Sequence, residues 1–251
     1  MRPIVTLLSD FGTADGYVAE VKGTILSRAP EAVIIDVAHD LPPHDIEGGR
    51  LAIARYWRKF PGGTVHFAVV DPGVGSARRP LAVESDGRFL VGPDNGLLSP
   101  ALLLAGAKAV ELPVPTGASP TFHGRDVFAP AAALLAAGAH LDALGSPAVD
   151  PQLRRTREAR RIAEGVIEGV VITVDRFGNA VTNLLAAHGG VVEVGQLHLP
   201  VLRTYADVAP GTPLALVGSS GLIEIAVRDG NASALLGLAR GATVLLRTAR
   251  R

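Results

Sequence analysis

"TVHFAVVDPGVGSARRP", residues 64–80, joins an apolar run to a polar, glycine-rich loop. The run at 64–71 is mostly apolar and rich in β-branched side chains, a pattern typical of a strand buried on both faces of a sheet. It ends in the carboxylate of Asp71 and then passes through a proline and two glycines to Arg78 and Arg79. Ligands of open α/β sheets bind beyond the carboxyl ends of strands, so this stretch predicts a sheet with a polar site at its edge.

Similar apolar runs recur on both sides of this stretch, at 4–10, 32–36 and 88–94. Apolar residues at helical spacing occupy three other segments, 15–29, 45–60 and 125–141. Strands that alternate with helices in this way indicate an α/β domain with a largely parallel sheet. We expect this domain to span residues 1–150 and to hold the catalytic site.

The pattern changes after residue 160, where short apolar runs are separated by Gly, Pro and Asn. Such a pattern is typical of an antiparallel barrel or sandwich, and we expect a smaller all-β, barrel-like domain over residues 162–251. The polar and basic stretch at 151–161 predicts a solvated linker between the two domains.

Composition limits the possible functions. Lys plus Arg and Asp plus Glu are both 24 in 251 residues, and a net charge of zero argues against a dedicated nucleic-acid binder. The absence of cysteine excludes disulfides, a thiolate nucleophile and Cys-ligated zinc. The N-terminal apolar run is too short for a signal peptide, and no apolar run approaches the roughly 20 residues of a membrane span. We expect a cytoplasmic protein with neither nucleic acid nor membrane as a partner.

Aspartates follow four apolar runs and are expected to gather at one edge of the sheet: Asp10, Asp36, Asp71 and Asp94. The glycines after Asp71 do not form a dinucleotide-binding or Walker A motif, so phosphate binding has little support. A G-x-S-x-G nucleophile elbow is absent as well, so a serine hydrolase of that type has no support.

The segment "DVAHDLPPHD", residues 36–45, concentrates side chains that commonly bind metals: Asp36, His39, Asp40, His44 and Asp45. The two histidines are five residues apart across a double proline, not four apart on a helix as in common zinc motifs. A metal-dependent hydrolase that uses Asp36, His39, Asp40 and His44 stays open as an alternative.

Two further segments carry candidate functional residues. In "TFHGRD", residues 121–126, His123 precedes a glycine at the start of an expected helix, where it is a candidate for chemistry. In "VDRFGNAVTN", residues 174–183, Asp175 and Asn179 flank a Phe-Gly turn, and a simple β-turn explains that pattern equally well.

Six segments together resemble one enzyme family: "LLSDFGTADGYV", "VVDPGVGSARRP", "FLVGPDNGLLSP", "TFHGRDVFAP", "VDRFGNAVTN" and "VGSSGLIEIAVRDGNAS". The sequence resembles the S-adenosyl-L-methionine (SAM) hydroxide adenosyltransferases, also called adenosine-forming SAM hydrolases. These are related to the SAM-dependent fluorinases and chlorinases. The resemblance runs from Ile4 to about Leu246 and covers both expected domains.

The resemblance implies an α/β domain, a barrel-like domain and a homotrimer that binds SAM between subunits. It implies attack of water on C5′ of the ribose, which yields adenosine and L-methionine with no cofactor and no metal. A protein that binds SAM or a nucleoside without turnover is the remaining alternative.

The family's catalytic set falls on Asp71, Arg78 and His123, and Arg78 rather than Arg79 has the family spacing from the aspartate. Halogenating relatives lack this combination, so the resemblance favours hydroxide over halide. It also assigns substrate contacts by group: the ribose diol to Asp10, the methionine ammonium to Asp175 and Asn179, packing on the ligand to Phe177, the carboxylate to Ser219 and Ser220, and the adenine to Asn231 and Ala232.

Overall fold

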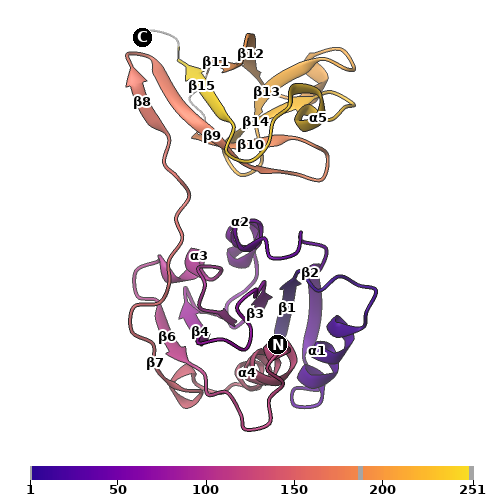
Figure 1. Ribbon diagram of the computed structural model, residues 1–251, viewed down its shortest axis with the longest axis vertical. Coiled ribbons are helices and arrows are strands. Elements are labelled where there is room, and N and C mark those ends of the chain that lie inside the picture. Colours follow the sequence, from indigo (N-terminus) through magenta and orange to yellow (C-terminus); the bar gives the residue numbers. More distant parts are fainter. Residues whose placement is uncertain (1, 186–188, 249–251) are drawn as a thin grey trace. The chain divides into compact units, whose positions relative to one another are not determined.

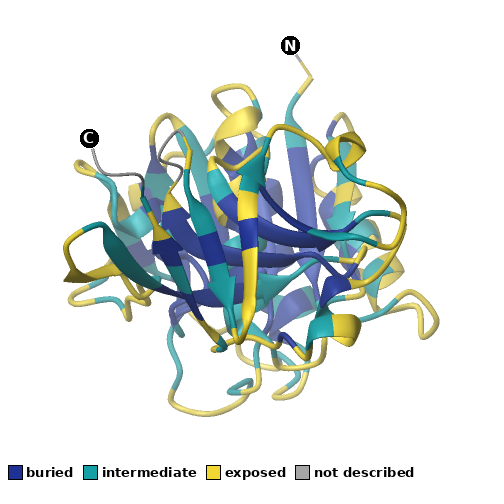
Figure 2. Ribbon diagram, turned by 90° about the horizontal axis from the view of Figure 1, so that it is seen from above, coloured by how far each residue is buried: buried dark blue, intermediate teal, exposed yellow. Residues whose placement is uncertain are grey.

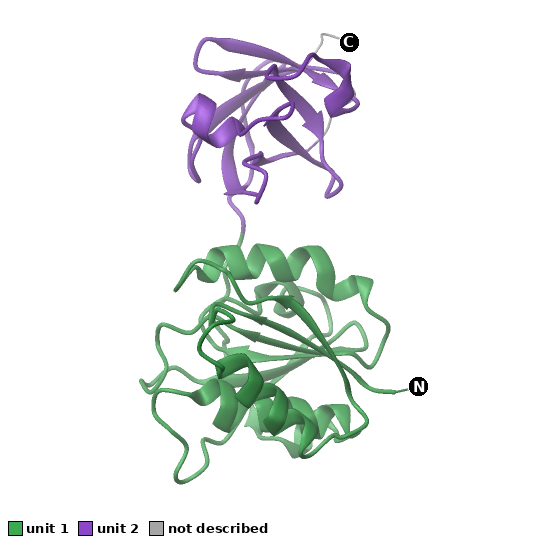
Figure 3. Cartoon of the chain, turned by 90° about the vertical axis from the view of Figure 1, so that its right-hand side faces the viewer, with its two compact units in different colours: residues 1–155 green, residues 156–251 purple. Residues whose placement is uncertain are grey.

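The computed structural model describes residues 2–185 and 189–248. The chain divides into two compact units, residues 1–155 and 156–251 (Figure 3). The boundary between them falls inside the basic stretch 151–161. Within the described ranges, no helix is both long and apolar enough to cross a membrane.

The described strands of unit 1 form one seven-stranded sheet in the order β2-β1-β3-β5-β4-β6-β7 (Figure 1). These strands are β1 (Ile4–Ser9), β2 (Val33–Ala38), β3 (Val65–Val69), β4 (Pro80–Ser85), β5 (Arg88–Pro93), β6 (Lys108–Glu111) and β7 (Ser146–Pro147). The pairs β1–β2, β1–β3 and β3–β5 are parallel, whereas β4–β5, β4–β6 and β6–β7 are antiparallel. The expectation of a largely parallel sheet is therefore wrong, because the sheet is mixed.

A tight hairpin explains the antiparallel half. Only Asp86 and Gly87 connect β4 to β5, and both have positive φ, 47° and 68°. A two-residue turn with this geometry matches the twist of antiparallel strands, whereas a parallel connection needs a dozen or more residues. An Asp-Gly pair between two apolar runs is a typical hairpin signal.

Helices cover both faces of this sheet, which separates two apolar cores (Figure 3). One face packs against α1 (Tyr17–Leu26) and α4 (Ala129–Ala136), and the other against α2 (Ile46–Tyr56), the 3-10 turn η1 (Trp57–Lys59) and α3 (Ser99–Leu102). The side chains of β1 alternate between the faces, with Leu7 toward α1 and α4 and Leu8 toward α2. Strands covered on both sides are buried, as Figure 2 shows in dark blue.

The helices expected within 15–29 and 45–60 are confirmed as α1 and α2. The segment 125–141 is more irregular than expected. A π-helical turn, η2 (Gly124–Phe128), leads into α4, with Pro130 in the first turn of α4, and the 3-10 turn η3 (Leu141–Ala143) follows. His123 immediately precedes η2.

The described strands of unit 2 form an eight-stranded sheet in the order β10-β14-β13-β12-β11-β15-β9-β8. Their bounds are β8 (Arg160–Ala163), β9 (Val166–Val174), β10 (Ala180–Leu185), β11 (Val191–Val194), β12 (Leu197–Leu202), β13 (Pro213–Val217), β14 (Leu222–Val227) and β15 (Thr243–Arg247). An additional pairing of β9 with β10 closes seven of them into a barrel and leaves β8 outside the ring. The barrel-like C-terminal fold is therefore confirmed.

The long strand β9 closes the barrel because its two halves pair with different neighbours. Its first half pairs with β15 and its second half with β10. At Gly169 a Cβ atom would lie 2.6 Å from Leu184, so a glycine permits the close approach of β10. The 3-10 turn η4 (Tyr205–Asp207) and the short helix α5 (Ala232–Leu236) lie in the connections between strands.

Candidate active site

The carboxyl ends of β1 and β3 border one pocket. The two strands are parallel neighbours, with Ser9 opposite Val69, so the residues that follow them emerge side by side. Asp10 and Asp71 both line a cavity of about 150 Å³ there, together with Phe11, His44, Phe122 and His123. This edge is where open α/β sheets bind ligands.

The loop after β3 turns the chain back toward its own start. The Val74 amide donates to the Asp71 carbonyl over 3.2 Å, and the Ser76 amide donates to the Gly73 carbonyl over 3.2 Å. Gly75 has a φ of 74°, and a Cβ atom at this position would lie 2.3 Å from the carbonyl oxygen of Pro120. These two turns need a glycine at position 75, and they return Arg78 to the carboxylate that follows the strand.

Arg78 links the other two members of the predicted catalytic set. Its Nε donates to Asp71 Oδ1 over 3.1 Å and its Nη2 to Asp71 Oδ2 over 2.5 Å. The same Nη2 lies 3.2 Å from His123 Nδ1, which accepts the hydrogen bond because a guanidinium can only donate. The Arg78 and Asp71 side chains are 7% and 5% exposed. The structure thus brings Asp71, Arg78 and His123 into direct contact.

Burial shifts the pKa of both titratable partners of Arg78. Burial raises the pKa of the Asp71 carboxyl, while the charge and hydrogen bonds of Arg78 oppose that rise. Burial and the positive charge of Arg78 both lower the pKa of His123, so its imidazole is neutral at neutral pH. Asp71 is therefore a better proton acceptor than an exposed aspartate, and His123 stays uncharged beside the guanidinium.

One nitrogen of the Arg78 guanidinium makes no hydrogen bond to the described residues. Arg78 Nη1 is buried and has no hydrogen-bond partner among the described residues. Buried donors without partners are rare in proteins and often mark the position of a water, an ion or a ligand. A water oxygen is the smallest acceptor that would satisfy this group.

Asp10 is held by the backbone of a strained residue. The His44 amide donates to Asp10 Oδ2 over 2.8 Å, and His44 has a φ of 68° although it is not a glycine. Such a conformation is unfavourable for a residue with a Cβ atom and tends to occur at functional sites. Asp10 Oδ1 accepts no hydrogen bond from the described residues, so it can bind a ligand.

The candidate metal ligands of segment 36–45, which belong to the alternative of a metal-dependent hydrolase, have other partners in the structure. His39 contacts Asp36 and Ser9, Asp45 caps α2 by accepting from the Gly48 amide, and His44 lies in the pocket beside Asp10. No group of three or more His, Asp or Glu residues that could hold a metal ion occurs in residues 2–185 and 189–248.

The four aspartates lie at or near the carboxyl ends of parallel strands, but two of them do not line the pocket. Asp36 lies inside β2 and forms an ion pair with Lys22, 2.6 Å away. Asp94 is buried and accepts from Arg79 over 2.5 Å and from the Gln152 amide over 2.6 Å. Both side chains are therefore engaged elsewhere, and only the other two aspartates line the pocket.

In unit 2, Asp175 organises the predicted Phe-Gly turn. Its Oδ1 accepts from the amides of Phe177 and Asn179 over 2.9 and 2.8 Å, and its Oδ2 accepts from Asn179 Nδ2 over 2.9 Å. Gly178 has a φ of 85°, which suits glycine. The Phe177 side chain is held at the tip of this turn and is 76% exposed.

The start of α5 packs against this turn. A Cβ atom on Gly178 would lie 2.2 Å from the Asn231 side chain, and the Ser233 amide donates to the Gly178 carbonyl over 2.9 Å. Asn231 caps the helix by accepting from the Ala234 amide, and Ala232 is buried. Ser219 and Ser220 lie exposed in the turn between β13 and β14 and take no part in these contacts.

Two further polar residues, Tyr205 and Glu224, lie next to Asp175 and Asn179 and are not predicted from the sequence. Asn179 Nδ2 lies 3.4 Å from the Tyr205 hydroxyl, and burial raises the Tyr205 pKa, helped by the charges of Glu224 and Asp175. Glu224 is buried in β14, where a Cβ atom on Gly218 would lie 1.8 Å from its Oε1. A glutamate inside the apolar run "GLIEIAV" is the signal that could have identified it.

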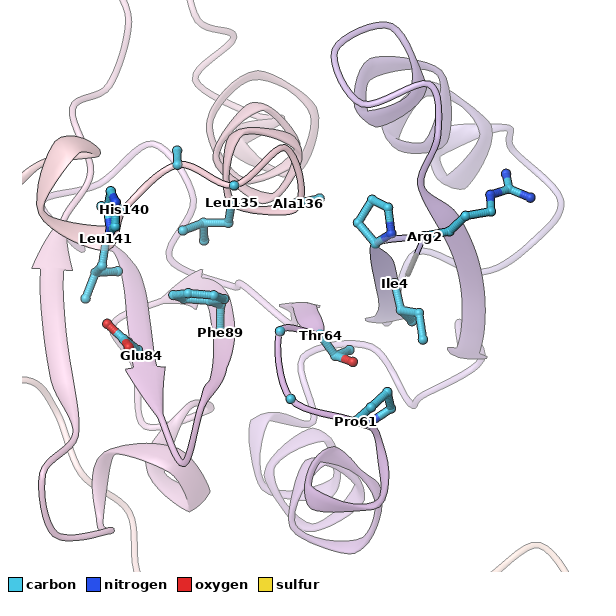
Figure 4. A pocket seen from close by; sticks show the side chains of 15 residues that line it. Arg2, Ile4, Pro61, Thr64, Glu84, Phe89, Leu135, Ala136, His140 and Leu141 are labelled. Carbon is cyan, nitrogen blue, oxygen red and sulfur yellow. The ribbon is translucent and has the colours of Figure 1, made fainter.

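A roomier cavity of about 410 Å³ lies at the opposite, amino-terminal ends of β1 and β3 (Figure 4). Its charged or titratable side chains are Arg2, Glu84 and His140, from separate elements, and no hydrogen bond joins any two of them in the described structure. We therefore place the candidate active site at the carboxyl-terminal edge, despite the smaller cavity there.

The chain is similar to known proteins over most of its length. The profile of the SAM hydroxide adenosyltransferase N-terminal domain matches residues 5–145, and that of the C-terminal domain matches residues 169–245. An (R)-S-adenosyl-L-methionine hydrolase of Thermus thermophilus is 48% identical, covering 98% of this chain and 100% of its own length. A fluorinase of an Actinoplanes species is 30% identical, covering 90% of this chain and 91% of its own length.

The fold is shared with a solved structure as well. An uncharacterized conserved protein from Thermotoga maritima superposes with a TM-score of 0.89 at 30% identity and covers 97% of this chain and 100% of its own. Both domain profiles match in order, and the similarity to the hydrolases extends over nearly the whole chain. This chain therefore belongs to the SAM hydroxide adenosyltransferase family.

Proposed function

We propose that this chain hydrolyses SAM by attack of water on C5′ of the ribose and releases adenosine and L-methionine. The observation that carries the proposal is the direct contact of Asp71, Arg78 and His123 in a buried corner of the pocket. Family membership and the full-length similarity to proteins named SAM hydrolases support it.

The nucleophile is the difficult part of this reaction. The sulfonium leaves as a neutral thioether, so the leaving group needs no general acid. Water is a weak nucleophile and has to be aligned opposite the sulfur at C5′. As the new O–C5′ bond forms and the C5′–S bond breaks, the water must lose one proton.

Each member of the catalytic set has a role in that step. The free Nη1 of Arg78 donates to the water oxygen and favours its hydroxide character. Asp71, with its raised pKa, accepts the proton, and the neutral His123 helps to orient the water. Nothing is oxidised or reduced and the second substrate is water, so the proposed chemistry requires no cofactor.

The proposed substrate contacts are those that the family resemblance implies, and the geometry of Asp10, Asp175 and Phe177 supports three of them. Asp10 Oδ1, which accepts no bond from the described part of the chain, receives the ribose hydroxyls. The carboxylate of Asp175, with Asn179, binds the methionine ammonium, and the exposed ring of Phe177 packs on the ligand. The remaining contacts are the methionine carboxylate with Ser219 and Ser220, and the adenine with Asn231 and Ala232.

We propose further that three chains form a ring and that each site combines residues of two subunits. Asp10, Asp71, Arg78 and His123 belong to residues 1–150, and the contacts to methionine and adenine come from residues 162–251 of a neighbour. The exposure of Phe177, Ser219 and Ser220 fits residues that meet a second subunit. A head-to-tail ring of three pairs two different surfaces at every interface, as this division requires.

Incubation with SAM followed by chromatography tests the proposal. We expect adenosine and methionine in equal amounts, and the same turnover when a chelator is present. Formation of 5′-methylthioadenosine would mean that a different C–S bond is broken, and the proposed reaction would then be wrong. Binding of SAM without any product would instead favour a non-catalytic SAM-binding protein.

A further inference from the structure

A chain of hydrogen bonds runs from the surface to the end of β1, and we call it the β1 brace: Lys22, Asp36, His39 and Ser9. Lys22 Nζ donates to Asp36 Oδ2 over 2.6 Å, and His39 Nε2 lies 3.1 Å from Asp36 Oδ1. His39 Nδ1 lies 2.7 Å from Ser9 Oγ. Ser9 is fully buried and His39 is 7% exposed, so the inner half of the brace is shielded from water.

The chemistry of the groups gives the brace one direction. An ionised Asp36 can only accept, so His39 Nε2 carries a proton, and in the neutral imidazole His39 Nδ1 then accepts from the Ser9 hydroxyl. Burial alone would raise the pKa of Asp36, but hydrogen bonds from Lys22 and His39 outweigh it and lower that pKa, which keeps the carboxylate ionised. The Ser9 oxygen in turn faces the Phe11 amide at 3.4 Å.

The brace ends at the segment that carries Asp10. Ser9 immediately precedes Asp10, and the Gly12 amide donates to the His39 carbonyl over 2.7 Å. The His44 amide holds Asp10 Oδ2, as described above. Residues 9–12 are therefore tied at three points to residues 39–44.

The same segment also contacts the neighbourhood of His123. The Phe11 ring packs edge-on against Phe122 with a centroid distance of 5.7 Å. A Cβ atom on Gly124 would lie 3.0 Å from the Phe11 ring, so there is little room for that ring to move. A shift of residues 10–12 would consequently disturb both sides of the pocket.

We infer that Ser9 and His39 are positioning residues that hold the Asp10 carboxylate in the orientation needed to bind the ribose diol. The inference rests on the proposed function, which assigns the diol to Asp10. It gives the Asp36–His39 pair a role that involves no metal: Asp36 orients the imidazole, the imidazole orients the Ser9 hydroxyl, and Ser9 fixes the backbone next to Asp10. Partners of this kind control the geometry of ligand-binding groups without touching the ligand.

A pair of nucleosides tests this role directly. Calorimetry would measure the affinity of the whole protein for adenosine and for 2′,3′-dideoxyadenosine, which lacks both hydroxyls that Asp10 binds. In Ser9→Ala we expect adenosine to bind about tenfold more weakly, because charge-assisted hydrogen bonds to the diol are misaligned. Binding of the dideoxy compound should change less than about twofold, since it makes no such bonds.

Two substitutions of His39 separate the two ends of its ring. His39→Asn keeps a polar atom near the position of Nδ1 and can still accept from Ser9, so it should retain most of the preference for adenosine. His39→Gln keeps a polar atom near the position of Nε2, toward Asp36, and should behave like Ser9→Ala. Asp86→Asn is the control for a general effect of removing an ion-paired aspartate. Like Asp36, Asp86 forms ion pairs, in its case with Arg58 and Arg88, but it lies in the β4–β5 hairpin.

The outcomes distinguish this inference from the proposed function. A wild-type protein that binds both nucleosides equally would show that Asp10 does not bind the diol. That result would contradict both the proposed diol contact and the inference about Ser9 and His39. A wild-type protein that prefers adenosine, with a Ser9→Ala variant that keeps the preference or loses affinity for both compounds alike, would overturn the inference alone. If a thermal unfolding experiment shows that Ser9→Ala is not folded, Asp36→Asn at the exposed end of the brace takes its place. We then expect the affinity for adenosine alone to fall about threefold.

Discussion

Replacement of Arg78 by lysine tests whether the planar guanidinium, and not only its charge, is needed for turnover. Arg78 makes three contacts within the catalytic set, two with Asp71 and one with His123. A lysine keeps the charge, but its single nitrogen cannot span both Asp71 oxygens and His123 as the planar fork does. We assume that it retains one of the three contacts and loses two.

The expected size of the effect follows from these contacts. A hydrogen bond to a charged group contributes about 1.5 kcal/mol at the low end, so two lost contacts amount to about 3 kcal/mol. One decade in rate corresponds to about 1.4 kcal/mol, so kcat of Arg78→Lys should fall about 100-fold. KM should change little, because in the proposed mechanism Arg78 acts on the water and not on SAM.

The neighbouring arginine provides a matched control. Arg79 donates to Asp94 and to the carbonyls of Val149 and Asp150, so it holds the end of unit 1 together and does not contact Asp71. Arg79→Lys should lower the unfolding temperature and leave kcat within about threefold of wild type. Steady-state kinetics with SAM would compare the two variants. A larger loss of kcat in Arg79→Lys than in Arg78→Lys would refute the reasoning.

Three further predictions concern assembly, stability and metals. Asp71→Ala and Asp175→Ala should each be nearly inactive. When the two are unfolded and refolded together in equal amounts, about a quarter of wild-type activity should return, because random assembly of the proposed trimers repairs one site in each mixed trimer. No recovery in the presence of mixed trimers would exclude shared sites. Burial lowers the pKa of His66 to about 4, so this neutral imidazole stabilises the fold above pH 6.5, and about 3 kcal/mol of that stability is lost as the pH falls to 4. Urea unfolding at pH 7 and pH 4 should show that the free energy of unfolding falls less in His66→Gln than in the wild type. An equal fall in the two proteins would contradict this. Turnover of SAM should be unchanged in a chelator, whereas a loss that a divalent ion restores would favour a metal-dependent mechanism.

The pocket at the end of β3 was within reach of sequence reasoning, because its ingredients are local. Asp71 and Arg78 are seven residues apart on one loop, and the glycines between them indicate a tight return of the chain. His123 lies 45 residues beyond Arg78, and only the resemblance to a family joins it to the pair. The number of residues between Arg78 and His123 does not indicate that their side chains are in contact.

One open alternative and one expectation differ from the structure for physical reasons. The residue types at 36–45 are those of a metal site, but Asp36 and His39 serve equally well in a hydrogen-bond chain, and only the position of Ser9 decides between the two. The sheet was expected to be largely parallel because β4 was not recognised, although the Asp86–Gly87 turn requires an antiparallel partner for β5. Pairings between strands far apart in sequence are set by packing, which single-sequence patterns do not record.

The central claim is that water attacks C5′ of SAM, and isotopic labelling of the product tests it most directly. The protein is incubated with SAM in water enriched in heavy oxygen, and the adenosine and methionine are analysed by mass spectrometry. We predict one heavy oxygen in the 5′-hydroxyl of adenosine and none in methionine, because the C5′–S bond is the one that breaks. Unlabelled adenosine, or label that enters methionine instead, would contradict the account.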